Sequence, residues 1–169
     1  MRVYLIKSDS DTKKLSSTFF PQVFYLETGD NVKYEDVRRG KNGKPLPIND
    51  YYFNISHSGN YWCIAFSDSE CGIDIEINRQ LKAHISKKIL FPSENLIDDN
   101  ILKNWVIKEA YAKMIGVGIS VGLNNINMTD IFDKCTVTDL SSDDYICYAV
   151  GTDSVSNITK LSWSNGKLF

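Results

Sequence analysis

Two acidic residues stand close together inside an apolar stretch, CGIDIEIN, which covers residues 71–78. Isoleucines alternate with Asp74 and Glu76, and this alternation predicts a β-strand that carries both carboxylates on one face. Side chains two apart on a strand have Cα atoms roughly 6.6 Å apart, so the two like charges repel each other. A divalent cation bound by both would remove the repulsion, and Mg²⁺ prefers such oxygen ligands. The pair indicates a metal site or, as is commoner for such pairs, a solvated strand face.

A second group of charged residues lies in the stretch NWVIKEAYAKMIG, residues 104–116. Glu109 and Lys113 are four residues apart, so a helix would carry them on one face. The alternative is a surface ion pair worth about 0.3–0.5 kcal/mol. Trp105, one turn earlier, places Glu109 near the boundary with the core, and Lys108 projects about 100° away from it.

A third group consists of donors for anionic oxygens. Ser56 and His57 lie in FNISHSGNYW just before a glycine turn, and Lys41 and Lys44 lie in the loop GKNGKP. A histidine in a turn and lysines in a solvated loop are ordinary features on their own. Together with acidic metal ligands and further lysines, they would suit a nucleotide or polyphosphate ligand.

The hydrophobic pattern predicts an α+β chain. Residues 61–67 and 71–78 are expected to pair as a hairpin, and Pro21 is expected to prevent a helix within the segment 8–37. Helices are predicted at 80–90 and 99–115. Strands are predicted at 1–7, 52–56, 61–67, 71–78, 125–128, 135–140, 144–150 and 158–163.

The composition argues against several classes of protein. The net charge of −2 over 169 residues is not that of a general nucleic-acid binder. No apolar run approaches the ~20 residues of a membrane span, and the N-terminus turns polar after six residues, unlike a secretory signal. Four cysteines without CxxC spacing and only two histidines argue against zinc. We therefore expect reduced, mostly buried thiols in a cytoplasmic protein that binds neither membrane nor nucleic acid.

The order of these motifs resembles the 4′-phosphopantetheinyl transferases of the Sfp-like, surfactin-synthetase-activating type. The resemblance covers about residues 40–125, and three motifs in the same order make it specific although each is weak alone. The matching stretches are GKP (43–45), FNISHSG (53–59), GIDIE (72–76), WVIKEAYAK (105–113) and GVGISVGL (116–123).

The resemblance implies a fold and a domain organisation. The expected fold is a pseudo-dimer of two small α+β halves with antiparallel sheets, in a monomer. Residues 1–70 would form a trimmed N-terminal half that holds the adenosine end of coenzyme A, and residues 71–169 would carry the metal and catalytic residues.

The resemblance also implies an activity: Mg²⁺-dependent transfer of the 4′-phosphopantetheine arm from coenzyme A to a serine of an apo acyl or peptidyl carrier protein, with release of 3′,5′-ADP. The implied metal ligands are Asp74, Glu76 and Glu109. The implied catalytic residues are Asp74, Glu109 and Lys113. The implied coenzyme A ligands are Lys44, Ser56, His57, Lys108 and Lys113. Glu94, in FPSE, matches a position that is often acidic near the metal.

Three points leave alternatives open. Val106 replaces a small polar residue usual in the family, and the chain is short for the Sfp-like type. The general base is either Glu109 or a metal-bound water. A non-catalytic relative that binds coenzyme A or a carrier protein, and an unrelated Mg²⁺-dependent phosphohydrolase, are the competing functions.

Overall fold

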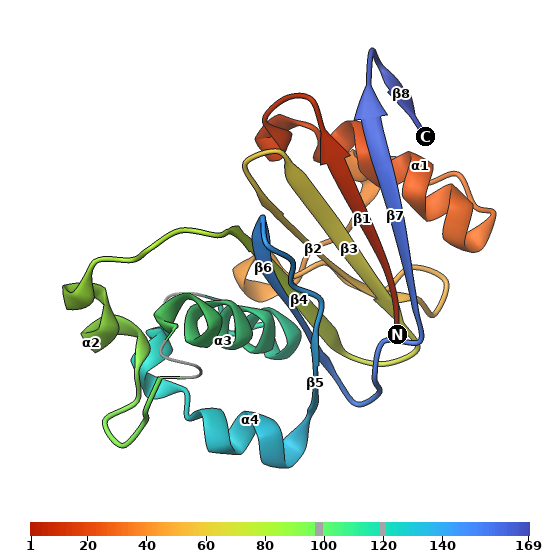
Figure 1. The fold of residues 1–169 in the computed structure, drawn as a ribbon. Coiled ribbons are helices and arrows are strands. Elements are labelled where there is room, and N and C mark those ends of the chain that lie inside the picture. Colours follow the sequence, from red (N-terminus) through yellow and green to blue (C-terminus); the bar gives the residue numbers. More distant parts are fainter. Residues whose placement is uncertain (97–99, 119–120) are drawn as a thin grey trace.

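A mixed five-stranded sheet forms one side of the protein in the computed structural model, which describes residues 1–96, 100–118 and 121–169. Its strand order is β2-β3-β1-β7-β8, and the strands are Tyr52–Ser58, Tyr61–Ser67, Arg2–Ser8, Asn157–Ser164 and Lys167–Leu168. β1 and β7 run parallel, whereas the other neighbours are antiparallel. The expected antiparallel pairing is thus confirmed for most neighbouring strands, but β1 and β7 depart from it, because the chain returns from the second sheet to pair with its own N-terminal strand (Figure 1).

A second sheet of three antiparallel strands has the order β4-β6-β5. Its strands are Cys71–Ile77, Tyr145–Gly151 and Thr136–Asp139. The strand predicted around Asp74 is confirmed as β4, but the predicted hairpin of β3 with β4 is wrong. β3 pairs with β1 on one edge and β2 on the other, so it has no free edge for β4, which pairs with β6 instead. The hairpin in this region joins β2 and β3 through Gly59 and Asn60.

Helix α1, Ser16–Thr28, covers the outer face of the first sheet and contains Pro21. The prediction that this proline would prevent a helix is wrong. A proline inside a helix costs about 3 kcal/mol, but tertiary packing offsets this cost. Four side chains of α1 are fully buried in an aromatic cluster with the sheet: Phe19, Phe20, Val23 and Phe24.

Helix α3, Ile101–Ile115, covers the second sheet and matches the prediction closely. Asn100 caps its first turn by accepting a hydrogen bond from the backbone N–H of Leu102 at 3.0 Å, and residue 99 of the predicted range lies outside the described residues. Gly116 ends the helix with a φ of 71°.

The other helical segments are shorter than, or different from, the prediction. The helix expected at 80–90 is a 3₁₀ turn, Ala83–Ile85, followed by α2, Ser86–Ile89. The strand expected at 125–128 is wrong, because a 3₁₀ turn ends there and α4, Met128–Lys134, begins. Asn127 caps α4 through its side chain and so turns the backbone into a helix. Further 3₁₀ turns cover Thr12–Lys14, Tyr34–Asp36 and Lys41–Gly43.

The two sheets pack face to face between the two long helices, in the layer order α1, first sheet, second sheet, α3 (Figure 1). The chain passes from the first sheet to the second between Ser67 and Cys71, and residues 157–168 return to the first sheet. All four cysteines are free thiols, and three of them are buried. Among the helices of the described residues, none combines the length and apolar character that crossing a membrane requires.

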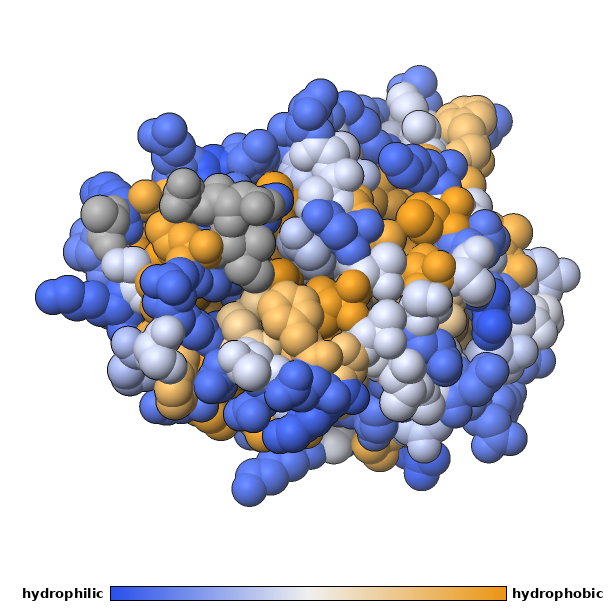
Figure 2. Space-filling model, turned by 60° about the horizontal axis from the view of Figure 1, so that its bottom comes forward, coloured by the Kyte–Doolittle hydropathy of each residue, from blue (hydrophilic) through white to orange (hydrophobic). Residues whose placement is uncertain are grey.

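The face at the bottom of Figure 1, near α4, carries uncovered apolar surface. Figure 2 looks toward this face and shows apolar residues gathered near its centre, with hydrophilic ones around them. Phe132 of α4 is 52% exposed. The fold itself therefore does not cover all of its apolar surface on this side.

Candidate active site

The candidate site lies where strands β2 and β4, each at the edge of its sheet, face each other. Side chains of β2 bond to the backbone of β4 in a regular series. The backbone N–H of Ile73 donates to Asn54 Oδ1 at 3.3 Å, and the next two alternate N–H groups of β4 donate to the hydroxyls of Ser56 and Ser58. The series links the two sheets and turns the acidic face of β4 toward β2.

Asp74 is buried in this junction and is 3% exposed. Its Oδ1 atom accepts hydrogen bonds from Ser56 Oγ at 2.7 Å and from Lys113 Nζ at 2.6 Å. Its Oδ2 atom is buried and has no hydrogen-bond partner among the residues that the structure describes. Burying a carboxylate oxygen without a partner costs free energy, so a cation bound to this oxygen would stabilise the site.

Lys113 reaches the junction from α3 and joins the elements of the site. Its ammonium also donates to Ser56 Oγ at 2.8 Å and to the Ile73 carbonyl at 3.2 Å. Burial alone lowers the pKa of this lysine, but the charge and hydrogen bond of Asp74 and the charge of Glu109 outweigh it and raise the pKa above its usual value. With 28% of its side-chain surface exposed, Lys113 is a permanent positive charge at the edge of a cavity.

Glu109 is buried one turn before Lys113 and is 8% exposed. Burial, followed by the charge of Asp74 and with a smaller effect of Glu76, raises the pKa of Glu109 from 4.5 to about 7, although Lys113 acts in the opposite direction. The buried indole N–H of Trp105 has no partner of normal hydrogen-bond geometry within the described residues, but it lies near enough to Glu109 to favour its charged form. Glu109 is therefore a carboxyl group able to accept and release a proton near neutral pH.

Glu76 lies at the rim, with 20% of its side-chain surface exposed. Its Oε2 atom accepts hydrogen bonds from Ser58 Oγ and from Arg79 Nη1, both at 2.9 Å. The arrangement repeats that of Asp74, with one serine of β2 and one basic residue on a single carboxylate oxygen.

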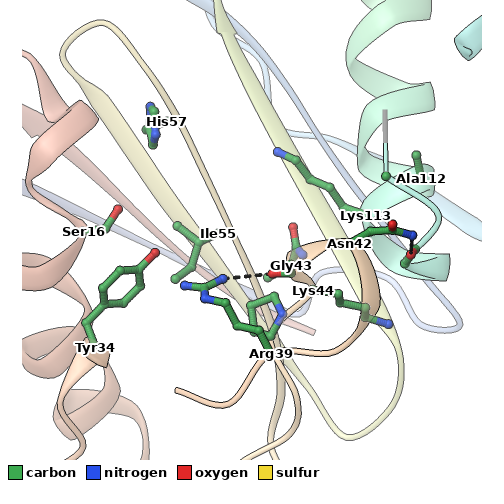
Figure 3. A pocket seen from close by; sticks show the side chains of 14 residues that line it. Ser16, Tyr34, Arg39, Asn42, Gly43, Lys44, Ile55, His57, Ala112 and Lys113 are labelled. Atoms are coloured by element: carbon green, nitrogen blue, oxygen red, sulfur yellow. Dashed lines mark hydrogen bonds between the residues drawn. The ribbon is translucent and has the colours of Figure 1, made fainter. Parts of the chain in front are cut away.

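A cavity of about 370 Å³ opens beside these residues. Basic side chains border it from two sides: Arg39, Lys44, His57 and Lys113. Figure 3 shows Lys113 reaching toward it from α3, while His57 and Tyr34 lie across from this helix. The guanidinium of Arg39 lies 5.2 Å from the centre of the Tyr34 ring, and its Nη1 donates to the Gly43 carbonyl at 3.0 Å. The cavity thus combines a high density of positive charge with an aromatic wall, as an anionic ligand with a flat ring system requires.

The loop before β2 closes this cavity against the end of α3. Asn42 Nδ2 donates to the Gly116 carbonyl at 2.9 Å (Figure 3), and Lys44 Nζ donates to the Met114 carbonyl. Lys44 also forms an ion pair with Glu70. Burial lowers the pKa of Lys44.

Lys108 and Glu94 form a separate buried pair. The Lys108 side chain is completely buried, and its ammonium donates to Glu94 Oε2 and to the Ile89 carbonyl at 2.7 Å. Glu94 also accepts hydrogen bonds from the backbone N–H groups of Phe91 and Met128. This ion pair joins α3, the segment after α2, and the start of α4, which is a structural role.

Comparison with known proteins identifies the superfamily of the chain. Residues 70–159, more than half of the chain, match the family described as the 4′-phosphopantetheinyl transferase superfamily. The chain belongs to this superfamily. It is 31% identical over 112 residues to the 4′-phosphopantetheinyl transferase gsp of Aneurinibacillus migulanus, covering 60% of this chain and 47% of that protein. It is 33% identical over 99 residues to the 4′-phosphopantetheinyl transferase Sfp of Bacillus subtilis strain 168, covering 51% and 43%. The match thus spans about half the length of these relatives.

Most of the side chains that the superfamily resemblance singles out come together in the structure. Five of them meet at the junction of β2, β4 and α3: Ser56, Asp74, Glu76, Glu109 and Lys113. Lys44 and His57 border the cavity. Lys108 does not border it, and its ammonium is held by Glu94 instead of pointing toward a ligand. Glu94 is likewise engaged by Lys108 and two backbone groups, away from the role near a metal expected for it.

The structure adds residues that the sequence patterns did not identify as site residues. Ser58 and Arg79 bind Glu76, and Tyr34 lines the cavity with Arg39. The alternation of Asn54, Ser56 and Ser58 in one strand was the available signal for Ser58. No local signal marks Tyr34, since it reaches the cavity only through the packing of its loop.

The acidic residues fit a Mg²⁺ ion in their chemistry, though not as a finished coordination site. No group of three acidic, histidine or cysteine side chains within residues 1–96, 100–118 and 121–169 has the arrangement of a ready metal cluster. Two observations nevertheless favour a cation: Asp74 Oδ2 is buried without a partner in the described chain, and the charges of Asp74 and Glu76 act on Glu109. Oxygen ligands of this number and charge are those Mg²⁺ takes in proteins.

Proposed function

We propose that the chain transfers the 4′-phosphopantetheine arm of coenzyme A to a serine of an apo acyl or peptidyl carrier protein. In this reaction the serine oxygen forms a bond to the phosphorus that carries the pantetheine. The diphosphate bond breaks, 3′,5′-ADP leaves, and the serine proton passes to a base. Membership of the superfamily and the names of the relatives support this activity.

The observation that carries the proposal is the position of the basic cavity beside the acidic junction. Lys113 belongs to both, because its ammonium binds Asp74 and its side chain borders the cavity. Phosphoryl transfer asks a protein mainly for positioning and for neutralisation of charge. A diphosphate that extends from the cavity toward Asp74 would lie between positive groups on one side and a carboxylate-bound cation on the other.

The residues take the following roles in this proposal. His57 and Arg39 bind the phosphoadenosine end, which the Tyr34 ring can contact, and Lys44 would join them by exchanging Glu70 for a phosphate oxygen. Lys113 neutralises the diphosphate. Glu109, which is buried beside Asp74 at the junction, accepts the proton of the carrier serine.

Asp74, Glu76 and Glu109 would hold Mg²⁺, which supplies charge neutralisation for the leaving diphosphate. Ser56 keeps Asp74 and Lys113 in register, because it bonds to both. Ser56 thus acts on the acidic side of the site and not as a coenzyme A ligand in this proposal.

The finer features of the resemblance are also part of the proposal. The two sheet-and-helix units would be the halves of a pseudo-dimer within one monomeric, cytoplasmic chain. The half that contributes the cavity loop and β2 would bind the adenosine end of coenzyme A. The half that contributes β4 and α3 would carry the acidic residues.

The test is a transfer assay on a panel of carrier proteins. The protein is incubated with coenzyme A, Mg²⁺ and each apo carrier, and intact-protein mass spectrometry measures the carrier. A gain of one phosphopantetheine arm that disappears with a metal chelator is expected. Serine-to-alanine substitution at the carrier's attachment site is the matched control. No gain on any carrier would contradict the proposal.

A non-catalytic relative is the second candidate, because the described residues contain no ready metal cluster and the match covers about half of the relatives. Binding of coenzyme A without transfer to any carrier would support it. Release of inorganic phosphate from nucleotides without a carrier would instead indicate a phosphohydrolase.

A further inference from the structure

Two serines of β2 form the same kind of hydrogen bond with the two acidic residues of β4. Ser56 Oγ donates a hydrogen bond to Asp74 Oδ1 at 2.7 Å, and Ser58 Oγ donates one to Glu76 Oε2 at 2.9 Å. In each pair the serine and the acidic residue are 18 positions apart in the sequence. The two pairs are therefore neighbouring contacts between the same two strands, two residues apart along each strand, as the side-chain period of a strand requires. This repeated geometry indicates that the two hydroxyl groups have the same structural role.

The backbone of β4 fixes the direction in which each hydroxyl group donates. The N–H of Ile75 donates to Ser56 Oγ at 3.4 Å, and the N–H of Ile77 donates to Ser58 Oγ at 3.1 Å. A serine hydroxyl carries one hydrogen atom and can accept other bonds through its lone pairs. Because each oxygen accepts from the backbone, its own hydrogen atom is left for the carboxylate.

A basic side chain joins the same carboxylate oxygen in both pairs. Lys113 binds Asp74 Oδ1 at 2.6 Å, and Arg79 binds Glu76 Oε2 at 2.9 Å. The second oxygen of Asp74 is buried without a partner, and for the second oxygen of Glu76 the described part of the chain offers no hydrogen bond. One oxygen of each carboxylate is thus anchored, and the other is left available.

We propose that Ser58 is a positioning residue for the cation site, which anchors one oxygen of Glu76 so that the other can bind the metal. Ser56 does the same for Asp74. This inference rests on the proposed function, because it requires the divalent cation of that reaction. Hydrogen bonds to a ligating carboxylate fix its orientation, and their loss typically costs about 10- to 100-fold in metal affinity.

Ser58 is the better of the two serines to test. Ser58→Ala leaves the N–H of Ile77 without its partner, but Ile77 is 36% exposed, so water can replace the hydroxyl group. Ser56→Ala would leave the buried N–H of Ile75 and the ammonium of Lys113 each short of a hydrogen bond, and a loss of stability would make a change in metal binding hard to interpret. The Ser58 variant separates metal binding from folding.

The experiment measures binding of Mn²⁺, a spectroscopic substitute for Mg²⁺, by electron paramagnetic resonance on the whole protein, with and without coenzyme A. Ser58→Ala should weaken Mn²⁺ binding about tenfold without lowering the melting temperature of the metal-free protein. Ser58→Thr keeps the hydroxyl group on a residue that suits a strand and should restore the affinity. Ser164→Ala is the matched control, because Ser164 is a half-buried serine of β7 with no hydrogen bond to an acidic residue in the described structure.

The outcomes distinguish this inference from the proposed function. Mn²⁺ binding that is equal in the wild type and in Ser58→Ala would overturn the role of Ser58 and leave the transferase proposal standing. The same conclusion would follow if Ser58→Thr bound as weakly as Ser58→Ala. Two results together would support both the transferase proposal and the role of Ser58. The wild-type protein would transfer the arm only with Mg²⁺, and the Ser58→Ala variant would bind Mn²⁺ more weakly than the wild type.

Discussion

The substitution Glu109→Gln should make the metal-free protein more stable at alkaline pH. The Glu109 carboxyl group is buried beside Asp74 and Glu76, and burial followed by their charges raises its pKa to about 7. A carboxyl group whose pKa is raised by folding stabilises the protein most at pH values below its unfolded pKa. This contribution is lost as the pH rises through the folded pKa. Glutamine has a similar shape and stays neutral, so the variant should not lose stability over this range.

The size of the effect follows from the two pKa values. With 4.5 in the unfolded chain and about 7 in the folded protein, proton linkage gives a loss of about 2.5 kcal/mol in the free energy of unfolding between pH 5 and pH 8. The variant should therefore match the wild type to within about 1 kcal/mol at pH 5 and exceed it by about 2–3 kcal/mol at pH 8. Transfer activity should be lost at both pH values, because the base is absent.

Urea denaturation with a metal chelator present, at pH 5 and pH 8, measures this difference. Histidine titration contributes equally to both proteins and cancels from the comparison. Glu35→Gln, at an exposed position, is the matched control and should change the free energy of unfolding little at either pH. If Glu109→Gln differs from the wild type by the same amount at pH 5 and pH 8, the reasoning about burial and charge at Glu109 is refuted.

Three further predictions concern packing, ligand binding and proton transfer. Gly72→Ala should destabilise the protein by about 2 kcal/mol or more, since a Cβ atom there would lie 1.9 Å from the Ala110 carbonyl oxygen of α3; a melting temperature equal to that of the wild type would contradict this. His57→Ala should raise the KM for coenzyme A about tenfold with little change in kcat, because binding loses one charge-assisted hydrogen bond. Steady-state kinetics measure both constants, and an unchanged KM would show that His57 does not bind coenzyme A. Trp105→Phe should raise the pKa of Glu109 in the metal-free protein further, because the indole N–H favours the charged form of Glu109. The loss of stability with rising pH, measured by urea denaturation with a chelator, should then extend to higher pH, and an unmoved upper limit would show that Trp105 only packs.

Local pattern was sufficient for most strands and for the long helix, because alternation and the 3.6-residue period are properties of neighbouring residues. It failed where the outcome depended on distant parts of the chain. The hairpin of β3 with β4 does not form because β1, from the start of the chain, already pairs with β3. Helix α1 tolerates Pro21 because the first sheet buries its phenylalanines. Neither β1 nor that sheet is visible in the residues around the turn or the proline.

The sequence by itself determined which residues can do chemistry and some of their relative directions. It placed Asp74 and Glu76 on one face of a strand and Glu109 and Lys113 on one face of a helix, because backbone geometry fixes those directions. Only the tertiary structure decided which of these side chains come into contact. Packing of α3 on the second sheet brings Lys113 to Asp74, and it buries Lys108 in an ion pair with Glu94. The pKa of Glu109 likewise depends on burial and on the charges of Asp74 and Glu76 in strand β4, which no local pattern around Glu109 contains.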